Sequence, residues 1–271
     1  MENLKNIALN IRRNIVKMIY KASSGHPGGA LSCTDILTAL YFEEMNIDVK
    51  NPKSPDRDRF VLSKGHASAA LYATLAERGF IRKEELDGFR NINSNLQGHP
   101  DMNKIPGVDM STGSLGQGLS VANGIAIAGK LDNKKYRVYC LMGDGEIQEG
   151  QIWEAAMTAS QYKLDNLCAI IDYNGLQIDG KVTEVMSPLP IAEKFKSFGF
   201  NVININGNDI DEILDAFDKA RRGKGRPTVI IAKTVKGKGV SFMENQAGWH
   251  GKAPTEEEFE IAMKDLEKKR R

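Results

Sequence analysis

Apolar residues along this chain follow two alternating patterns. Some segments place an apolar residue at every third or fourth position, which is typical of an amphipathic helix, and others are short and continuously apolar, which is typical of a buried strand. The predicted helices cover residues 4–20, 32–45, 67–78, 114–130, 148–162 and 209–221, with a last charged helix after His250. The predicted strands cover residues 59–63, 138–142, 167–172, 201–206 and 228–233.

Strands and helices alternate along most of the chain, which predicts an α/β fold with a parallel sheet and helices on both faces. Ser32 and Asp35 offer a cap for the second helix, and the small residues of segment 114–130 would let that helix pack closely on the sheet. A length of 271 residues fits one α/β unit, and no repeat or linker interrupts the pattern. We therefore expect a single domain over residues 1–271.

Two polar turns follow neighbouring strands of the predicted sheet. Gly143-Asp144-Gly145 ends one strand, and Asn174 ends the next after 28 further residues that form one helical crossover. The carboxyl ends of parallel strands meet at one edge, where open α/β sheets bind ligands. A carboxylate and an amide oxygen there suit Mg²⁺ or Ca²⁺, with phosphate oxygens completing the shell. Either turn alone is ordinary, but together they indicate a site for a metal-bridged diphosphate.

Composition excludes several function classes. The chain is 41% hydrophobic and 27% charged with a net charge of +2, which predicts neither nucleic-acid nor membrane binding. We expect the basic tail over residues 268–271 to be a solvated end, and the amphipathic amino terminus not to be a signal peptide. Cys33, Cys140 and Cys168 lie apart in mostly apolar segments, so we expect reduced thiols and a cytoplasmic protein.

Only four histidines occur, and all lie in predicted loops beside glycine or proline. A histidine in a hydrophobic core would more often lie within a periodic apolar segment, so the shared setting favours one polar cleft. Zinc is not indicated, because no histidine–cysteine pair has the spacing of zinc ligands. The four residues are His26, His66, His99 and His250.

The loops that carry these histidines resemble those of transketolase, and the Gly-Asp-Gly and Asn pair resembles the thiamine diphosphate motif. The resemblance extends in order over essentially all 271 residues, but only to that family's amino-terminal, diphosphate-binding domain. It therefore implies the thiamine diphosphate-binding fold. The matching segments are residues 24–28, 62–66, 98–100, 112–118 and 143–174.

The resemblance implies a cofactor and a metal set. Asp144, Asn174 and the backbone carbonyl of Leu176 would bind Mg²⁺ or Ca²⁺. Gly145 would let the backbone approach the diphosphate of thiamine diphosphate. Lys236 matches a lysine that lies near the cofactor in some members, although a solvated charge in a Lys/Gly loop is an equal alternative.

The resemblance also implies roles for the histidines. His26 and His99 would contact hydroxyls of the ketose donor near the reacting carbon. His66 would contact the diphosphate. His250 would reach both the diphosphate and the substrate and assist proton transfer.

Other loop residues would border the cofactor or a subunit interface. The backbone at Gly113, Ser114 and Leu115 would border the aminopyrimidine ring, with Ser114 standing where many full-length members carry proline. Glu149 and Glu154 would lie buried at the interface and link two active sites, Glu149 also near the cofactor. Without the resemblance, both glutamates would be interpreted as exposed helix residues.

The implied activity is transfer of a two-carbon ketol unit from a ketose donor to an aldose acceptor, as in the pentose phosphate pathway. The family's pyrimidine domain, its activating glutamate and its carboxy-terminal domain have no counterpart in this sequence. We therefore expect the amino-terminal subunit of a split transketolase, a transferase active only with a carboxy-terminal partner chain in a heterotetramer of two copies of each.

Three alternatives remain from the sequence. The chain could be half of an enzyme like 1-deoxyxylulose-5-phosphate synthase, although residues 63–67 are more similar to transketolase. A 2-oxoacid dehydrogenase subunit fits a two-chain architecture but not the four histidines. A non-catalytic interaction module with the same fold would be expected to have lost the histidines first.

Overall fold

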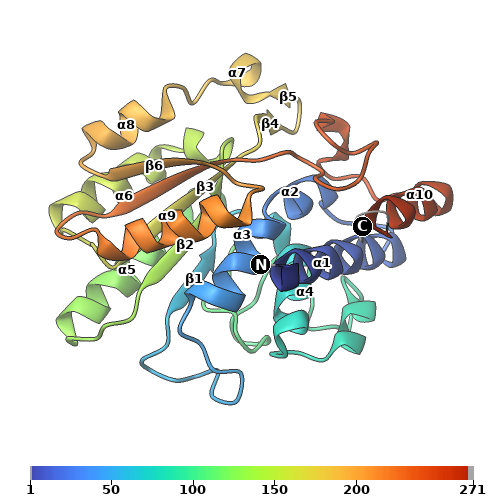
Figure 1. Cartoon of the computed structure of the whole chain (residues 1–271), viewed down its shortest axis with the longest axis horizontal. Helices are drawn as coiled ribbons and strands as arrows, with labels where there is room; N and C mark the ends of the chain where they lie inside the picture. Colours follow the sequence, from blue (N-terminus) through green and yellow to red (C-terminus); the bar gives the residue numbers. More distant parts are fainter. Residues whose placement is uncertain (1, 268–271) are drawn as a thin grey trace.

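A five-stranded parallel sheet forms the centre of the computed structural model, which describes residues 2–267 (Figure 1). Each strand pairs in parallel with its neighbours, so all carboxyl ends lie along one edge. The predicted α/β fold with a parallel sheet is therefore confirmed, and the basic tail lies outside the described residues. Across the sheet the strands are β1 (Arg59–Leu62), β2 (Val138–Gly143), β3 (Leu167–Tyr173), β7 (Thr228–Lys233) and β6 (Asn201–Asn206).

Each face of the sheet carries its own hydrophobic core. Side chains alternate between the faces of a strand, and in β2 Val138, Cys140 and Met142 enter one core while Tyr139 and Leu141 enter the other. The continuously apolar strands follow from this double burial. Helices over the core of Tyr139 include α1 (Glu2–Lys21), α3 (Thr34–Ala39), α4 (Ser68–Arg78), α9 (Ile210–Arg222) and α10 (Glu256–Glu267). Helices over the other core are α5 (Gln117–Leu131), α6 (Gly150–Gln161) and α8 (Ile191–Ser197).

The predicted element boundaries agree with the structure where the periodicity is long. Strands β6 and β7 have the predicted bounds, and α1 and α9 differ from prediction by one or two residues at each end. Asp209 caps α9, because its side chain accepts a hydrogen bond from the backbone N–H of Asp211 at 2.9 Å.

The predicted helix over residues 32–45 is present, but it begins at Thr34, and its last turn is π-helical. Helix α3 continues directly into a π-helical turn (Leu40–Glu44), and a separate short helix, α2 (Pro27–Ser32), ends just before α3. Neither predicted cap residue caps a helix. Ser32 donates to Asp172 at 2.5 Å, and Asp35 accepts two hydrogen bonds from Arg12 at 2.9 and 2.6 Å. The side chains of Ser32 and Asp35, which the local sequence pattern predicts to cap a helix, instead form hydrogen bonds with residues far away in the sequence.

The sequence reasoning missed the elements that follow Asn174. A two-stranded hairpin, β4 (Leu176–Gln177) with β5 (Gly180–Lys181), is followed by the short α7 (Val182–Val185) and by α8. These pieces are too short to show a period. Short 3-10 turns also occur at Gly65–Ala67, Lys83–Gly88, Glu146–Gln148 and Ala247–Trp249.

Helix α5 packs closely on the end of β1, as its small residues predict. A Cβ atom added at Gly118 would lie 2.3 Å from Oγ of Ser63, closer than any real contact. Glycine is therefore required where this helix crosses Ser63, the first residue after β1.

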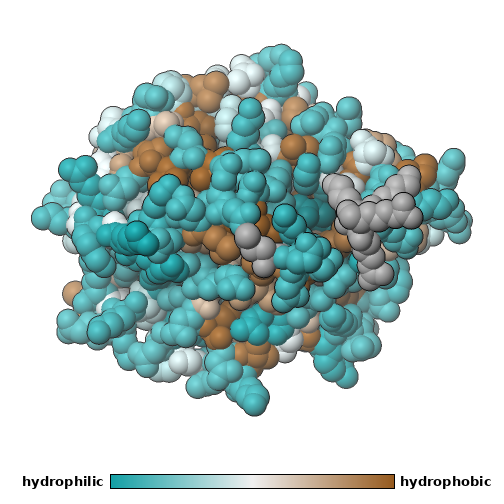
Figure 2. Space-filling model, in the orientation of Figure 1, coloured by the Kyte–Doolittle hydropathy of each residue, from teal (hydrophilic) through white to brown (hydrophobic). Residues whose placement is uncertain are grey.

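The surface is mostly hydrophilic on the face that Figure 2 shows, with hydrophobic side chains gathered at the upper left over α8 and β6. A hollow of about 620 Å³ between these elements has Ile191, Ile205 and Ile231 among its lining residues. Within residues 2–267, no helix combines the length and apolarity needed to cross a membrane. All three cysteines are buried and free, as predicted.

Candidate active site

Four segments with polar residues follow the carboxyl ends of β1, β2, β3 and β7. Gly143 pairs with Asp172 in the register of β2 and β3, so the turns that carry Asp144 and Asn174 begin side by side. The carboxylate of Asp144 accepts a hydrogen bond from the backbone N–H of Gly175 at 2.6 Å, which joins the two turns directly. The arrangement predicted from the strand ends is therefore present.

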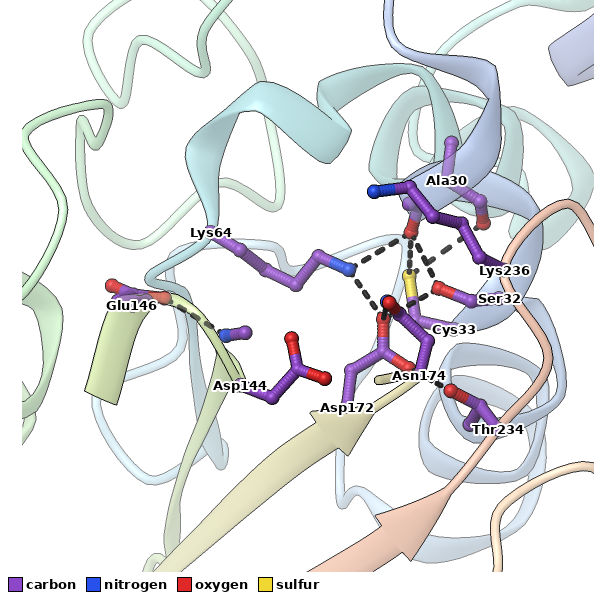
Figure 3. Close-up of polar contacts among 12 residues, drawn as sticks. Ala30, Ser32, Cys33, Lys64, Asp144, Glu146, Asp172, Asn174, Thr234 and Lys236 are labelled. Carbon is purple, nitrogen blue, oxygen red and sulfur yellow. Dashed lines mark hydrogen bonds and ion pairs between the residues drawn. The ribbon is translucent and has the colours of Figure 1, made fainter. Parts of the chain in front are cut away.

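Asp172 is the buried centre of this edge, and sequence reasoning did not single it out. Its carboxylate accepts hydrogen bonds from Ser32, Lys64 and Thr234, which lie in three separate segments (Figure 3). Lys64 also donates to the carbonyl of Gly29 at 2.9 Å. Burial acts to lower the pKa of Lys64, but the Asp172 carboxylate outweighs it and holds that pKa above its usual value. Asp172 thus ties the strand-end loops together.

Asp144 is a second carboxylate at this edge, 2% exposed. Burial and the negative charge of Asp172 raise the pKa of Asp144 to about 6. Hydrogen bonds from the backbone N–H groups of Gly145, at 2.9 Å, and Gly175 partly offset the free-energy cost of burying the charged carboxylate. A divalent cation would offset it further, since a buried carboxylate favours a nearby opposite charge. The residues present therefore fit a metal ion.

The two other predicted metal-binding groups lie on the adjoining turn. Asn174 accepts from the backbone N–H of Leu176 at 3.1 Å, and its amide nitrogen lies 3.5 Å from Asp172. The carbonyl oxygen of Leu176 accepts a hydrogen bond from Nζ of Lys236 at 3.1 Å, so this oxygen already faces a cation. A carboxylate, an amide oxygen and a carbonyl are hard oxygen donors that suit Mg²⁺ or Ca²⁺. Within the described chain, no cluster of three or more His, Cys, Asp or Glu side chains is placed to bind a metal.

The structure brings the four predicted histidines to one cavity of about 370 Å³. Ring centroids of His26, His66 and His250 lie 5.3–5.5 Å apart, and His99 lines the same cavity. The other predicted site residues among the lining are Gly113, Leu115, Asp144, Gly145, Glu149, Asn174, Leu176 and Lys236.

Burial and surrounding cations keep these imidazoles neutral. Burial first, then Lys236, lowers the pKa of His250 to about 3, and burial first, then Arg90, lowers that of His26 to about 4. Lys236 lies 3.0 Å from Nδ1 of His250. Because a lysine ammonium only donates, Nδ1 accepts and the proton of His250 is on Nε2. Burial and the charge of Lys64 lower the pKa of Lys236 to about 8.

Glu146, which sequence reasoning missed, holds the glycine loop (residues 112–118) against the Asp144 turn. Its buried carboxylate accepts from Ser63 and from the backbone N–H groups of Gly116 and Gly143, both at 3.0 Å. Burial raises the pKa of Glu146. The only signal in the sequence was its place two residues after Asp144.

The glycine loop itself is shaped by contact with His99. Gly113 has φ of +151°, and a Cβ there would lie 3.0 Å from the His99 ring. Ser114 and Leu115 are exposed on the described chain. Glu149 and Glu154 are exposed as well, Glu149 at the cavity and Glu154 on α6. Their burial at a subunit interface stays a prediction.

The fold and the site together define a diphosphate-binding protein of the α/β class: a parallel sheet with a metal-compatible carboxylate and glycine turns at its carboxyl edge. A family model described as "Transketolase, thiamine diphosphate binding domain" matches residues 4–269. The chain belongs to the transketolase family and forms its thiamine diphosphate-binding domain.

Relatives of similar length are named as subunits. The chain is 48% identical over 255 residues to an apulose-4-phosphate transketolase subunit of Phocaeicola vulgatus, covering 94% of this chain and 90% of the relative. It is 46% identical over 266 residues to the 6-deoxy-6-sulfo-D-fructose transketolase subunit SqwG of a Clostridium species, covering 98% and 97%. The crystal structure of Campylobacter jejuni transketolase is similar with a TM-score of 0.92 and 36% identity, over 98% of this chain but 43% of that one. The chain thus spans less than half of a single-chain transketolase.

Proposed function

We propose that this chain supplies the diphosphate-binding half of a thiamine diphosphate-dependent ketol transferase and works with a second chain that carries the pyrimidine domain. The observation that carries the proposal is the buried Asp144 carboxylate at the edge of a cavity lined by four histidines. A metal ion with a bound diphosphate would neutralise the Asp144 carboxylate, and the diphosphate would contact the histidines.

In this proposal one side of the cavity holds the metal and the diphosphate. Asp144, Asn174 and the carbonyl oxygen of Leu176 bind Mg²⁺ or Ca²⁺. Gly145 lines the cavity and has no side chain to keep phosphate oxygens away from its backbone. Further contacts come from His66 and Lys236, both lining the cavity.

The other side binds the sugar. Thiamine diphosphate, when bound, supplies the nucleophilic carbon and the electron sink for ketol transfer. His26 and His99 bind hydroxyls of the ketose donor, and His250 presents its Nε2–H to the reacting oxygens. Neutral imidazoles suit this task at neutral pH, because they donate hydrogen bonds without a charge to solvate.

The exposed rim of the cavity is the proposed interface with the partner. The backbone at Gly113, Ser114 and Leu115 borders the aminopyrimidine ring, and Glu149 and Glu154 become buried on assembly. The names of the two subunit relatives support a two-chain enzyme. We propose a heterotetramer with two copies of each chain.

The substrates are proposed as sugar phosphates or related acid-bearing sugars. The names of the relatives refer to apulose 4-phosphate and to 6-deoxy-6-sulfo-D-fructose. The resemblance adds the ketoses of the pentose phosphate pathway. Three free buried thiols support a reducing compartment, the cytoplasm.

Reconstitution tests the proposal. The purified chain is assayed alone and after co-expression with the product of the neighbouring gene, using xylulose 5-phosphate, apulose 4-phosphate and 6-deoxy-6-sulfo-D-fructose as donors and ribose 5-phosphate or glyceraldehyde 3-phosphate as acceptors. We expect turnover only for the pair with thiamine diphosphate and Mg²⁺. Turnover by the isolated chain would overturn the split-subunit proposal. Condensation with loss of CO₂ from pyruvate would instead favour a synthase.

A further inference from the structure

Arg90 links the loop after residues 83–88 to the histidine cluster. Its Nη1 donates to Oγ of Ser24 at 2.8 Å, and its Nη2 lies 3.3 Å from Nδ1 of His26. The guanidinium therefore bridges a hydroxyl and an imidazole two residues apart. Neither the sequence motifs nor the resemblance singled out this arginine.

The direction of the second hydrogen bond fixes the chemistry of His26. A guanidinium carries donors only and stays protonated, so Nδ1 of His26 must be the acceptor. An imidazole that accepts at Nδ1 is neutral and carries its proton on Nε2. Arg90 thus selects one tautomer of His26, the one that presents an N–H from Nε2.

The surroundings of His26 agree with this neutral state. The rings of His66 and His250 lie 5.3 and 5.5 Å from it. Burial, then the charge of Arg90 and the proximity of His99 and Lys236, all lower the pKa of His26. The neighbours of His26 are therefore cationic side chains and other imidazoles, which disfavour a positive charge on its ring.

Arg90 is itself held firmly. Its backbone has φ of +61°, an unusual value for a residue with a side chain, and its N–H donates to the carbonyl of Leu96 at 2.7 Å. A Cβ at Gly98 would lie 3.0 Å from Nη2 of Arg90, so glycine leaves the space that the guanidinium fills. A left-handed arginine beside a site is the kind of local strain that persists when the surroundings over-determine it.

We propose that Arg90 is a positioning residue that holds His26 as the Nε2–H tautomer, so that His26 can only donate to the hydroxyl or carbonyl oxygen of a ketose donor. The role in donor binding rests on the proposed function, whereas the tautomer does not. Without Arg90, His26 would populate the other tautomer and lose its fixed donor.

Nuclear magnetic resonance of the full chain labelled with ¹⁵N-histidine tests the tautomer without any turnover, and only four histidines contribute signals. We expect the wild-type His26 ring to show a protonated Nε2 and an unprotonated Nδ1 at pH 7. Arg90→Ala should shift the Nδ1 signal toward the protonated range and raise the pKa of His26. Millimolar guanidinium should reverse both changes, which a merely structural role would not predict.

Kinetics of the reconstituted pair test the consequence. Arg90→Ala should raise the KM for the ketose donor about tenfold, the effect of one lost oriented hydrogen bond, with a smaller change in kcat. Arg222→Ala, at an arginine whose side chain is 78% exposed, is the matched control and should change neither. Should Arg90→Ala fail to fold, Arg90→Lys and Ser24→Ala carry the same test, with intermediate shifts expected.

Two results would overturn the proposal: a wild-type His26 that is protonated at Nδ1, or variants in which the His26 spectrum is unchanged. Loss of turnover by every reconstituted pair would count only against the proposed function.

Discussion

Lys64 and Asp172 form an ion pair that is buried on both sides, with side-chain exposures of 2% and 0%. Lys64 follows β1 and Asp172 is the penultimate residue of β3, so the pair spans β2, which lies between these strands. Removing one charge from such a pair leaves the other without compensation in a low-dielectric interior.

Lys64→Met should therefore destabilise the protein by about 3–5 kcal/mol, measured as the free energy of unfolding in urea. The matched control is Lys181→Met, at an exposed i,i+3 pair with Glu184, where we expect less than about 1 kcal/mol. An equal loss of unfolding free energy for the two substitutions would contradict the conclusion that the buried Lys64–Asp172 pair holds the strand-end loops together.

Asp144→Ala should abolish metal-dependent binding of thiamine diphosphate, because it removes the buried carboxylate proposed as a metal ligand. Isothermal titration calorimetry of the reconstituted pair with Mg²⁺ should show affinity reduced by at least about 100-fold. Asp179→Ala, an exposed aspartate in the β4–β5 turn, is the control and should bind normally. Unchanged affinity for Asp144→Ala would move the metal site elsewhere.

Two glycines of α5 should respond in opposite directions to alanine. Gly118→Ala places a methyl group 2.3 Å from Oγ of Ser63 and should destabilise by several kcal/mol, roughly the upper range for overpacking. Gly124→Ala meets nothing within 4 Å and should stabilise by about 0.5–1 kcal/mol through helix propensity. Thermal unfolding of the two variants compares them directly.

The free energy of unfolding should fall as the pH drops from about 7.5 to about 6. The native pKa of His26, about 4, and of His250, about 3, lie below the unfolded value of 6.5. The unfolded state therefore takes up protons first, and stability present above pH 6.5 is lost as the pH falls. Protonation of Asp144, with a native pKa of about 6, and of Glu146, whose pKa burial also raises, acts in the opposite direction and makes the slope smaller. His26→Asn should reduce the slope measured by urea unfolding across this range, and an unchanged slope would argue against a neutral His26.

The sheet and the strand-end motifs could be predicted from the sequence because both depend on local signals. Apolar runs mark buried strands, and parallel ends must share an edge, so the residue order alone was enough to place Asp144 and Asn174 together. The histidines of the cavity were found through their glycine-bordered loops. The resemblance supplied their expected roles.

What the sequence could not predict are partners far apart along the chain. Asp172 looked like the last residue of a strand, yet its carboxylate is bonded to residues 140, 108 and 62 positions away. Neither Glu146 nor Arg90 is one of the motif residues that the sequence analysis recognised. The side chain of Ser32 also forms its hydrogen bond with Asp172, and the prediction that Ser32 caps the following helix was therefore wrong.

Asp172 has a consequence for how the cavity responds to motion. Since one carboxylate accepts hydrogen bonds from the loops after β1 and β7 and from α2, none of these segments can open without weakening the hold on the others. Local fluctuations at this edge of the sheet must therefore be cooperative, as one unfolding unit. The entropy of ordering the cavity is lost when the chain folds, so an incoming cofactor meets walls that are already in place.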